Sequence, residues 1–190
     1  MAPTGLLSVL LLLLHAFIVR TNAARECQST DCYRYYNKQT RKYFVEKWPL
    51  VNWPTGEFYA GNVPIDESDP SRSLFFVFKP ASDAPVNETT IWLNGGPGCS
   101  SLAGFLQEVG PIEWAPGQLK PVKNQQYAWS KITNMLWVEY PVGVGFTTGE
   151  IRARNEVDAA KDFVGFFKNF QKLFSIQDYK TYVTVLSEQQ

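Results

Sequence analysis

Histidine is almost absent from this chain of 190 residues. The only one, His15, lies inside an apolar run near the N-terminus. A serine nucleophile needs a base that accepts its hydroxyl proton, and histidine usually fills that role. The rest of the chain offers no such base. We also expect no metal and no cofactor, because one histidine and three cysteines leave too few ligands for a tetrahedral zinc shell.

Cysteine is scarce as well, and its odd number has a consequence. The three thiols are those of Cys27, Cys32 and Cys99. In a secreted chain, an odd count leaves one thiol without an internal partner. Cys27 and Cys32 either bridge locally or each pair elsewhere, and their spacing does not decide between these alternatives.

The chain has no excess of charge of either sign. Lys and Arg together number 18, and so do Asp and Glu. This balance gives no reason to expect a nucleic acid or an anionic membrane as partner. Aromatic residues, in contrast, are abundant at 15%, which suits a folded core.

A long hydrophobic run occurs only near the N-terminus, from Leu6 to Val19. It is short for a membrane span, which needs about 20 apolar residues. Thr21-Asn-Ala23 follows with a small residue at a cleavage point. This pattern predicts that residues 1–23 are a secretory signal peptide rather than an anchor, and that the cleaved protein has no membrane partner. We therefore expect an extracellular or vacuolar location.

A glycosylation sequon lies at Asn87-Glu-Thr89, in a polar segment that contains proline. Together with the secretory signal it predicts a glycan on Asn87. Chance is the alternative reading, because Asn-x-Ser/Thr is a common tripeptide.

Hydrophobic patterns after the signal predict alternating strands and helices. Residues 24–50 form an N-terminal arm with one short helix. Strands are expected at 74–79, 89–93, 134–139 and from 182 onward, and helices at 100–108 and from Asn155, a helix N-cap, to about 173. The apolar face of the second helix is predicted to contain Val157, Ala160, Phe163 or Val164, Phe167 and Phe170. This order of elements is typical of a doubly wound α/β sheet.

The most informative stretch runs from Trp92 to Ser101. After an apolar strand, three glycines and a proline occupy four successive positions, Gly95 to Gly98. Such a turn brings backbone N–H groups close to a small negative group. It lacks the Lys and Ser/Thr of a phosphate loop, so an oxyanion hole is the stronger interpretation. A plain strand-to-helix turn is the alternative.

Several further motifs accompany this stretch in a fixed order. They are Phe58–Ile65, Trp92–Ser101, Gln107–Pro111, Tyr127–Trp129, Asn134–Phe146 and Tyr182–Thr184. In this series the chain resembles the serine carboxypeptidases, a family of secreted and vacuolar exopeptidases, and in particular their secreted fungal members. The resemblance covers about residues 50 to 184. It implies an α/β-hydrolase-like sheet over 51–184 and removal of C-terminal residues from peptides, so the implied partners are peptide or protein C-termini.

The resemblance also implies roles for individual residues. Gly96, with Gly95, would form part of the oxyanion hole. Trp92, Asn94 and Glu108 would hold the terminal carboxylate of a peptide. A carboxylate can bind beside a second carboxyl group only if the two share a proton, so binding would strengthen in acid. The alternatives are that Trp92 is a core aromatic residue, that Asn94 is a turn residue and that Glu108 lies on a solvated helix face.

Two more residues and one cysteine take implied roles. Tyr140 and Phe146 would be apolar walls near the reacting bond, or else parts of a packed strand exit. The nearby Gly143-x-Gly145 does not fit a dinucleotide fingerprint, because no helix opens directly after it. In the family, the counterpart of Cys99 bridges to a distant cysteine that has no equivalent in this sequence.

Ser187 falls in the register of the family's nucleophile. The strained nucleophile elbow needs small residues two positions before and after the serine. Val185 and Gln189 stand there instead, so we interpret Ser187 as a coincidence and 185–190 as a tail outside the family pattern. The expectation is a scaffold truncated before the elbow and inactive as written.

Three alternatives stay open for such a chain. It is a non-catalytic binder of peptide C-termini, a fragment of a carboxypeptidase-like acyltransferase, or an unstable product. The last follows because part of an α/β core leaves an open sheet edge and an exposed apolar face.

Overall fold

A five-stranded mixed sheet forms the centre of the computed structural model, which describes residues 32–96, 98–124 and 126–186. Its strands lie in the order β1-β2-β6-β3-β7. The bounds are β1 (Tyr59–Asp66), β2 (Asp69–Lys79), β3 (Glu88–Leu93), β6 (Asn134–Val138) and β7 (Lys180–Val185). β1, β2 and β6 pair antiparallel, whereas β6, β3 and β7 run parallel. The α/β class predicted above is therefore confirmed.

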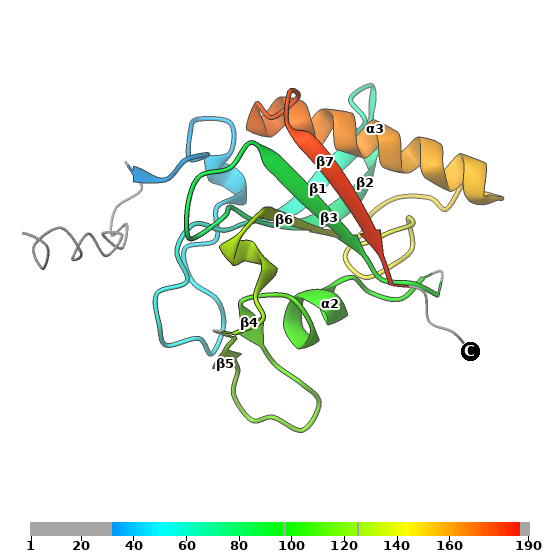
Figure 1. Ribbon diagram of the computed structural model, residues 1–190. Helices are drawn as coiled ribbons and strands as arrows, with labels where there is room; N and C mark the ends of the chain where they lie inside the picture. Colours follow the sequence, from blue (N-terminus) through cyan, green and yellow to red (C-terminus); the bar gives the residue numbers. More distant parts are fainter. Residues whose placement is uncertain (1–31, 97, 125, 187–190) are drawn as a thin grey trace, which may run out of the picture.

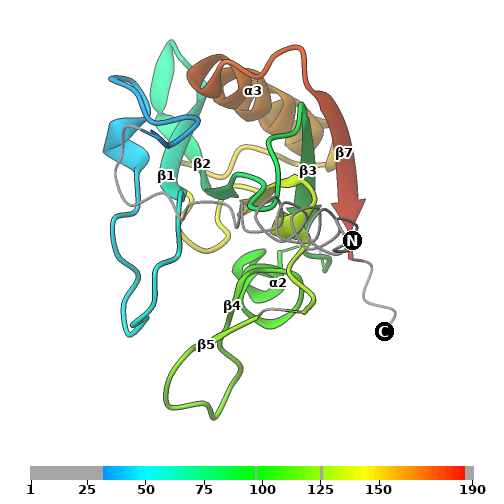
Figure 2. The same ribbon diagram turned by 60° about the vertical axis from the view of Figure 1, so that its left-hand side comes forward.

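Two helices cover opposite faces of this sheet (Figures 1 and 2). α3 (Glu156–Phe174) packs on one face and α2 (Leu102–Gln107) on the other. Successive strand side chains point to opposite faces, so neighbouring residues of β2 enter different cores. Phe76 and Phe78 pack with α3, whereas Val77 packs with α2. The chain thus buries two hydrophobic clusters, one on each face.

Smaller elements lie around the sheet. A two-stranded antiparallel sheet joins β4 (Ile112–Glu113) and β5 (Val122–Lys123). Two 3-10 helices, η2 (Arg41–Tyr43) and η3 (Trp129–Lys131), complete the elements in the described part of the chain. The arm before β1 is part of the core, because Tyr35 is buried against Phe78 and Phe174.

α3 begins where its cap predicts. The Asn155 side chain accepts a hydrogen bond from the backbone N–H of Asp158, at 2.9 Å, and the helix ends one residue beyond the predicted position. The predicted apolar face is wrong at Val157, which is 63% exposed. Of the two alternatives at the third position, Phe163 packs against the core, whereas Val164 is 50% exposed. The buried side chains are those of Phe166, Phe170 and Phe174. Their spacing of four residues keeps one aromatic stripe against the sheet.

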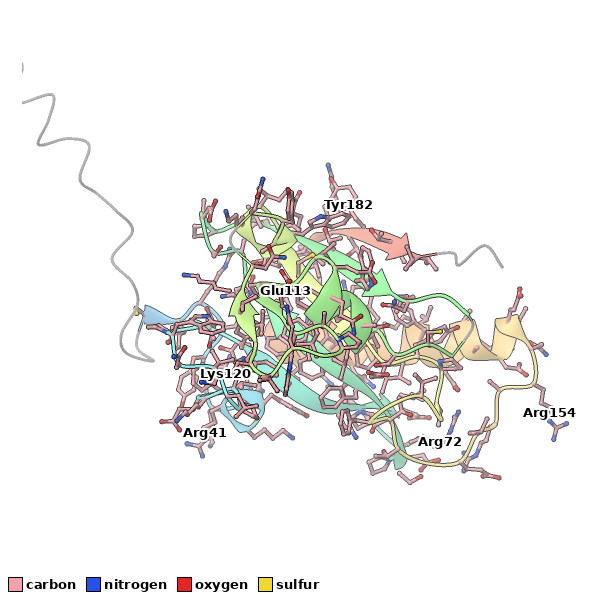
Figure 3. The ribbon with its side chains drawn as sticks, turned by 90° about the horizontal axis from the view of Figure 1, so that it is seen from below. Arg41, Arg72, Glu113, Lys120, Arg154 and Tyr182 are labelled. Carbon is pink, nitrogen blue, oxygen red and sulfur yellow. The ribbon has the colours of Figure 1, made fainter. Side chains whose placement is uncertain are left out.

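The strand predictions hold for β3 and β6, while β2 begins earlier than expected. β7 begins at Lys180 rather than Tyr182. The expectation that this strand is buried is wrong, because β7 lies at the edge of the sheet. β1 carries Pro64 at the edge of the sheet, where the missing N–H leaves no gap in a ladder. At the opposite edge, Tyr182, Val183 and Val185 of β7 are exposed, and Tyr182 projects outward (Figure 3). Among the described helices, none has the length and apolar character of a membrane span.

Candidate functional site

The glycine-rich loop follows the carboxyl end of a central strand. β3 ends at Leu93, the loop runs over residues 94–101, and α2 starts at Leu102. β6 lies beside β3 and runs parallel to it, so the segment after β6 leaves the sheet at the same edge. In open α/β sheets, ligands bind in the crevice outside the carboxyl ends of the strands. The candidate residues therefore stand where such a site is expected.

Asn94 is the centre of the hydrogen bonding at this loop. Its Oδ1 accepts from the indole Nε1 of Trp92 at 2.8 Å and from the backbone N of Gly104 at 3.2 Å. Its own backbone N–H donates to Oγ of Ser101 at 3.1 Å. Asn94 thereby joins the end of β3 to the first turn of α2.

These contacts determine which way the Asn94 amide points. An indole and a backbone N–H can only donate, so the atom that faces them must be the oxygen. The Nδ2 group is left to face Glu108, whose Oε1 lies 3.5 Å away. Glu108 is half-buried at the C-cap of α2, whereas its neighbour Gln107 is exposed. A donor and a carboxylate acceptor therefore stand side by side at one partly open position.

Trp92 fixes the orientation of the Asn94 side chain through its indole N–H. Its side chain is buried, and its ring makes an edge contact with Trp129 at 5.5 Å between centroids. Gly104 allows α2 to lie directly on the indole, because a Cβ atom there would stand 2.0 Å from Nε1. Trp92 is thus both a core residue and the donor that orients Asn94.

The loop itself has the backbone of a glycine turn. Gly96 has φ +122°, and a Cβ atom on it would lie 3.1 Å from the backbone N of Gly98 and 3.2 Å from that of Cys99. Cys99 N–H donates back to the carbonyl of Gly95 at 3.2 Å. Among the described residues, no group accepts from the N–H of Gly95 or Gly96. Gly96 is exposed and Gly95 half-buried, so these donors can reach a ligand.

A serine–glutamate contact that the sequence reasoning missed ties the loop to the next one. Ser100 Oγ donates to Oε1 of Glu139 at 2.6 Å. Glu139 is 1% exposed, and its Oε2 has no hydrogen-bond partner in the described part of the chain. Burial raises the pKa of Glu139, while the hydrogen bonds from Ser100 and Leu102 oppose that rise. A carboxylate directly after the buried strand 134–138 was the available signal.

Gly145, in the loop after β6, lies directly against the Glu139 carboxyl group. A Cβ atom at Gly145, which has φ +54°, would lie 2.2 Å from Oε2 of Glu139. The carboxyl group is therefore enclosed between the glycine-rich loop and the turn that contains Gly145.

Within the described part of the chain, no hydrogen bond or ring contact joins Tyr140 or Phe146 to the Asn94 group. Tyr140 is half-buried and makes an edge contact with Phe163 of α3, on the other face of the sheet from Trp92. Burial, with a smaller effect of Asp162, raises the pKa of its hydroxyl. Phe146 is 63% exposed, and its ring lies 5.2 Å from that of Phe75 in β2.

The remaining candidates are placed as follows. Ser187 and Cys27 lie outside the described residues, as does the predicted signal. Cys32 is disulfide-bonded, and Cys99 is a free, half-buried thiol. Asn87 is exposed, and its Oδ1 accepts from Nη2 of Arg34 at 2.8 Å. Within residues 32–186, apart from 97 and 125, no cluster of His, Cys, Asp or Glu could hold a metal ion.

Comparison with known proteins identifies relatives of this arrangement. The model of the serine carboxypeptidase family matches residues 49–187. Over 152 residues, 80% of this chain, the sequence is 53% identical to serine-type carboxypeptidase F of Aspergillus niger. It is 46% identical over 161 residues to a probable serine carboxypeptidase of Arthroderma benhamiae, which covers 77% of this chain. It is 33% identical over 186 residues, 92% of the chain, to the lysosomal protective protein of the mouse.

The chain spans only part of the length of these relatives. The matched region is 28% of the Aspergillus protein, 30% of the Arthroderma protein and 35% of the mouse protein. The similarity therefore concerns one portion of each relative, and that portion includes the glycine-rich loop, α2 and the loop after β6.

Proposed function

Because this chain belongs to the serine carboxypeptidase family, we propose that it supplies the peptide-binding part of a serine-type carboxypeptidase, which releases C-terminal residues from peptides. Asn94 and Glu108 bind the terminal carboxylate, and the N–H groups of Gly95 and Gly96 stabilise the oxyanion. The observation that carries this proposal is the oriented Asn94 amide, which presents Nδ2 beside the Glu108 carboxylate.

The proposed binding step follows from donor and acceptor chemistry. The Asn94 Nδ2 group donates to one oxygen of the peptide carboxylate. Glu108 accepts a hydrogen bond only from a protonated partner, so one proton lies between the two carboxyl groups. Binding therefore takes up a proton and strengthens as the pH falls. The indole of Trp92 keeps Asn94 in the required orientation and does not itself contact the peptide.

The oxyanion step uses backbone donors alone. A preorganised N–H group aimed at the developing charge typically lowers the barrier by about 3 kcal/mol. The positive φ of Gly96 lets the chain turn so that its N–H is free of internal acceptors. Ser100 and Glu139 hold the far side of the same loop in place.

Catalysis by these 190 residues would need a group that accepts the proton of a serine nucleophile. Proton transfer from a serine needs a base, and no histidine follows His15 in the sequence. We therefore expect the protein as printed to bind peptide C-termini without releasing amino acids. A second candidate function is that of a non-catalytic binder of peptide C-termini, which the oriented Asn94 amide beside Glu108 also supports.

Calorimetric titration with an N-blocked dipeptide at several pH values tests the anchor. For the wild type we expect the association constant to rise about tenfold for each pH unit of acidification between pH 7 and about pH 5, since one proton is taken up. Glu108→Gln should bind without this dependence. Gln107→Ala, at the exposed neighbouring position, is the matched control and should behave as the wild type. An unchanged pH dependence in Glu108→Gln refutes the proposed role of Glu108.

Location and modification belong to the same proposal. The apolar segment 6–19 and the sequon at Asn87 support secretion and glycosylation. Asn87 is exposed at the start of β3, at the other end of that strand from the glycine-rich loop. A glycan there leaves the carboxylate site open. Treatment with an endoglycosidase, followed by mass measurement of the secreted protein, tests this modification.

A further inference from the structure

A cavity lies at the opposite end of the parallel strands from the glycine-rich loop. Its volume is about 860 Å³. Its walls include three segments: residues 53–58, residues 79–85, and residues 128, 130 and 131. The second of these segments precedes β3 and the third precedes β6 (Figure 1). The cavity is therefore at the amino ends of the parallel strands, whereas the Asn94 group is at their carboxyl ends. The two sites share no residue.

Lys79 is the unusual residue of this cavity. It ends β2, lines the cavity and is only 7% exposed. Its Nζ donates to the carbonyl oxygen of Glu57 at 3.2 Å and lies 4.9 Å from the centroid of the Phe58 ring. An ammonium group has three donors, and the described residues provide a hydrogen-bond acceptor for one of them. The remaining donors are therefore available to an acceptor that enters the cavity.

The carboxylate of Glu57 does not satisfy these donors, because it is engaged elsewhere. Oε1 accepts from the backbone N of Tyr35 at 2.7 Å and from the hydroxyl of Tyr59 at 2.7 Å, and Oε2 accepts from the backbone N of Arg34 at 2.9 Å. Burial lowers the pKa of Lys79 to about 8, and the charge of Glu57 opposes that shift. Lys79 is therefore mainly an ammonium ion at pH 7.

The charges around Lys79 favour an anion. The charged residues that line the cavity are Arg34, Glu57, Lys79, Asp83, Lys123 and Lys131. Four are cationic and two are acidic, and the carboxylate of Glu57 is already bonded. The lining thus carries two more positive than negative charges, in a chain with no net charge.

The walls of the cavity are apolar and held in place. Trp53, Pro54, Pro80, Pro85, Pro111 and Ile112 supply apolar surface. Asn134 anchors the loop before β3, accepting from Ala81 N at 2.9 Å and donating to the carbonyl of Glu88 at 2.7 Å. The backbone N of Ser82 donates to the carbonyl of Ser130 at 2.8 Å. This wall is therefore formed before a ligand arrives, as in most small-molecule sites.

We propose that this cavity is a binding site for a small monocarboxylate with an apolar body, whose carboxylate pairs with the Lys79 ammonium. The apolar body lies against the proline and tryptophan walls. A single buried cation matches a single carboxylate, and the apolar lining selects against small, strongly hydrated anions such as inorganic phosphate. This site is independent of peptide binding at Asn94 and Glu108.

Calorimetry at pH 7 with 3-phenylpropionate and its uncharged amide tests the site. We expect the acid to bind at least about tenfold more tightly than the amide, because only the acid forms a charge-assisted hydrogen bond between its carboxylate and the Lys79 ammonium. Lys79→Met keeps the length of the side chain and should reduce acid binding about tenfold or more. Lys120→Met is the matched control, because Lys120 is exposed in the β4–β5 loop and does not line the cavity (Figure 3).

A second test uses only the wild-type protein, so its result does not depend on whether Lys79→Met folds. It measures the amide chemical shifts with and without the ligand. Saturation with 3-phenylpropionate should move the signals of Gly56 and Ala81 and leave that of Gly96 unchanged. Glu108→Gln should bind the acid as the wild type does, which separates this site from the proposed peptide site. Equal affinity for acid and amide, unchanged binding in Lys79→Met, or shifts confined to Gly96 would overturn the proposal. Binding should also weaken above pH 8, where Lys79 loses its proton.

Discussion

Substitutions of Asn94 separate its structural role from its proposed binding role. In Asn94→Ala the indole N–H of Trp92 and the backbone N–H of Gly104 lose their acceptor, and both residues are buried. A buried donor without a partner costs about 1–3 kcal/mol, so with two such donors the free energy of unfolding should fall by about 2–6 kcal/mol. Peptide binding should be lost in the same variant.

Asn94→Asp keeps the acceptor and removes only the Nδ2 donor. Trp92 and Gly104 still donate to it, and Ser101 still accepts from the backbone N–H. The new carboxylate faces Glu108, and both positions are half-buried. Repulsion between two charges near 4 Å costs about 1 kcal/mol in bulk water and about 4 kcal/mol near a protein surface. We therefore expect a loss of about 1–4 kcal/mol in stability at pH 7, which disappears in acid, together with a loss of peptide binding of at least about tenfold.

The assay combines urea denaturation followed by circular dichroism with calorimetric titration of an N-blocked dipeptide. At about pH 5, where a shared proton relieves the repulsion, we expect the Ala variant to be clearly less stable than the Asp variant, and both to bind poorly. If Asn94→Asp proves as unstable as Asn94→Ala at that pH, the orientation assigned to the amide is wrong. If Asn94→Asp binds the dipeptide as the wild type does, the Nδ2 donor has no role in carboxylate binding.

Three further changes test other parts of the structure by denaturation. Gly104→Ala places a Cβ atom 2.0 Å from Nε1 of Trp92 and should cost about 1–3 kcal/mol; wild-type stability would contradict the close packing of α2. Asn155→Ala removes the cap bond to Asp158 and should cost about 1 kcal/mol, with Glu156→Ala as the neighbouring control. For Glu139→Gln the expected result depends on pH. Burial raises the pKa of Glu139 in the folded state, so the wild type loses stability as the pH rises from the unfolded value near 4.5 through the folded value. The Gln variant does not titrate, and its stability relative to the wild type should increase across that window; a constant difference would refute this.

Local patterns predicted the elements whose signals are contiguous. The apolar runs of β3 and β6 and the cap at Asn155 each act through neighbouring residues, and the structure confirms them. The glycine-rich turn was also visible, because positive φ at Gly96 needs glycine. Its oxyanion role, like the carboxylate-binding role of Glu108, stays a prediction.

Features that depend on distant residues were not predictable in this way. Nothing near Glu139 in the sequence indicates that Ser100, 39 residues earlier, donates to it. The exposure of Val157 and Val164 follows from the position of α3 over the sheet, which only the packing of Phe166, Phe170 and Phe174 reveals. The cavity at Lys79 likewise forms from segments that are separated by up to about a hundred residues. Tertiary contacts of this kind override local periodicity.

Recognition of a free peptide carboxylate by Asn94 and Glu108 underlies the function proposed for this protein. A comparison at about pH 5 of the binding of an N-blocked dipeptide with that of its C-terminal amide tests this recognition in the wild-type protein. We expect the free acid to bind, and the amide to bind at least about tenfold more weakly, because the amide has no carboxylate to share a proton with Glu108. Equal affinity for the two ligands, or no binding of either, would contradict it.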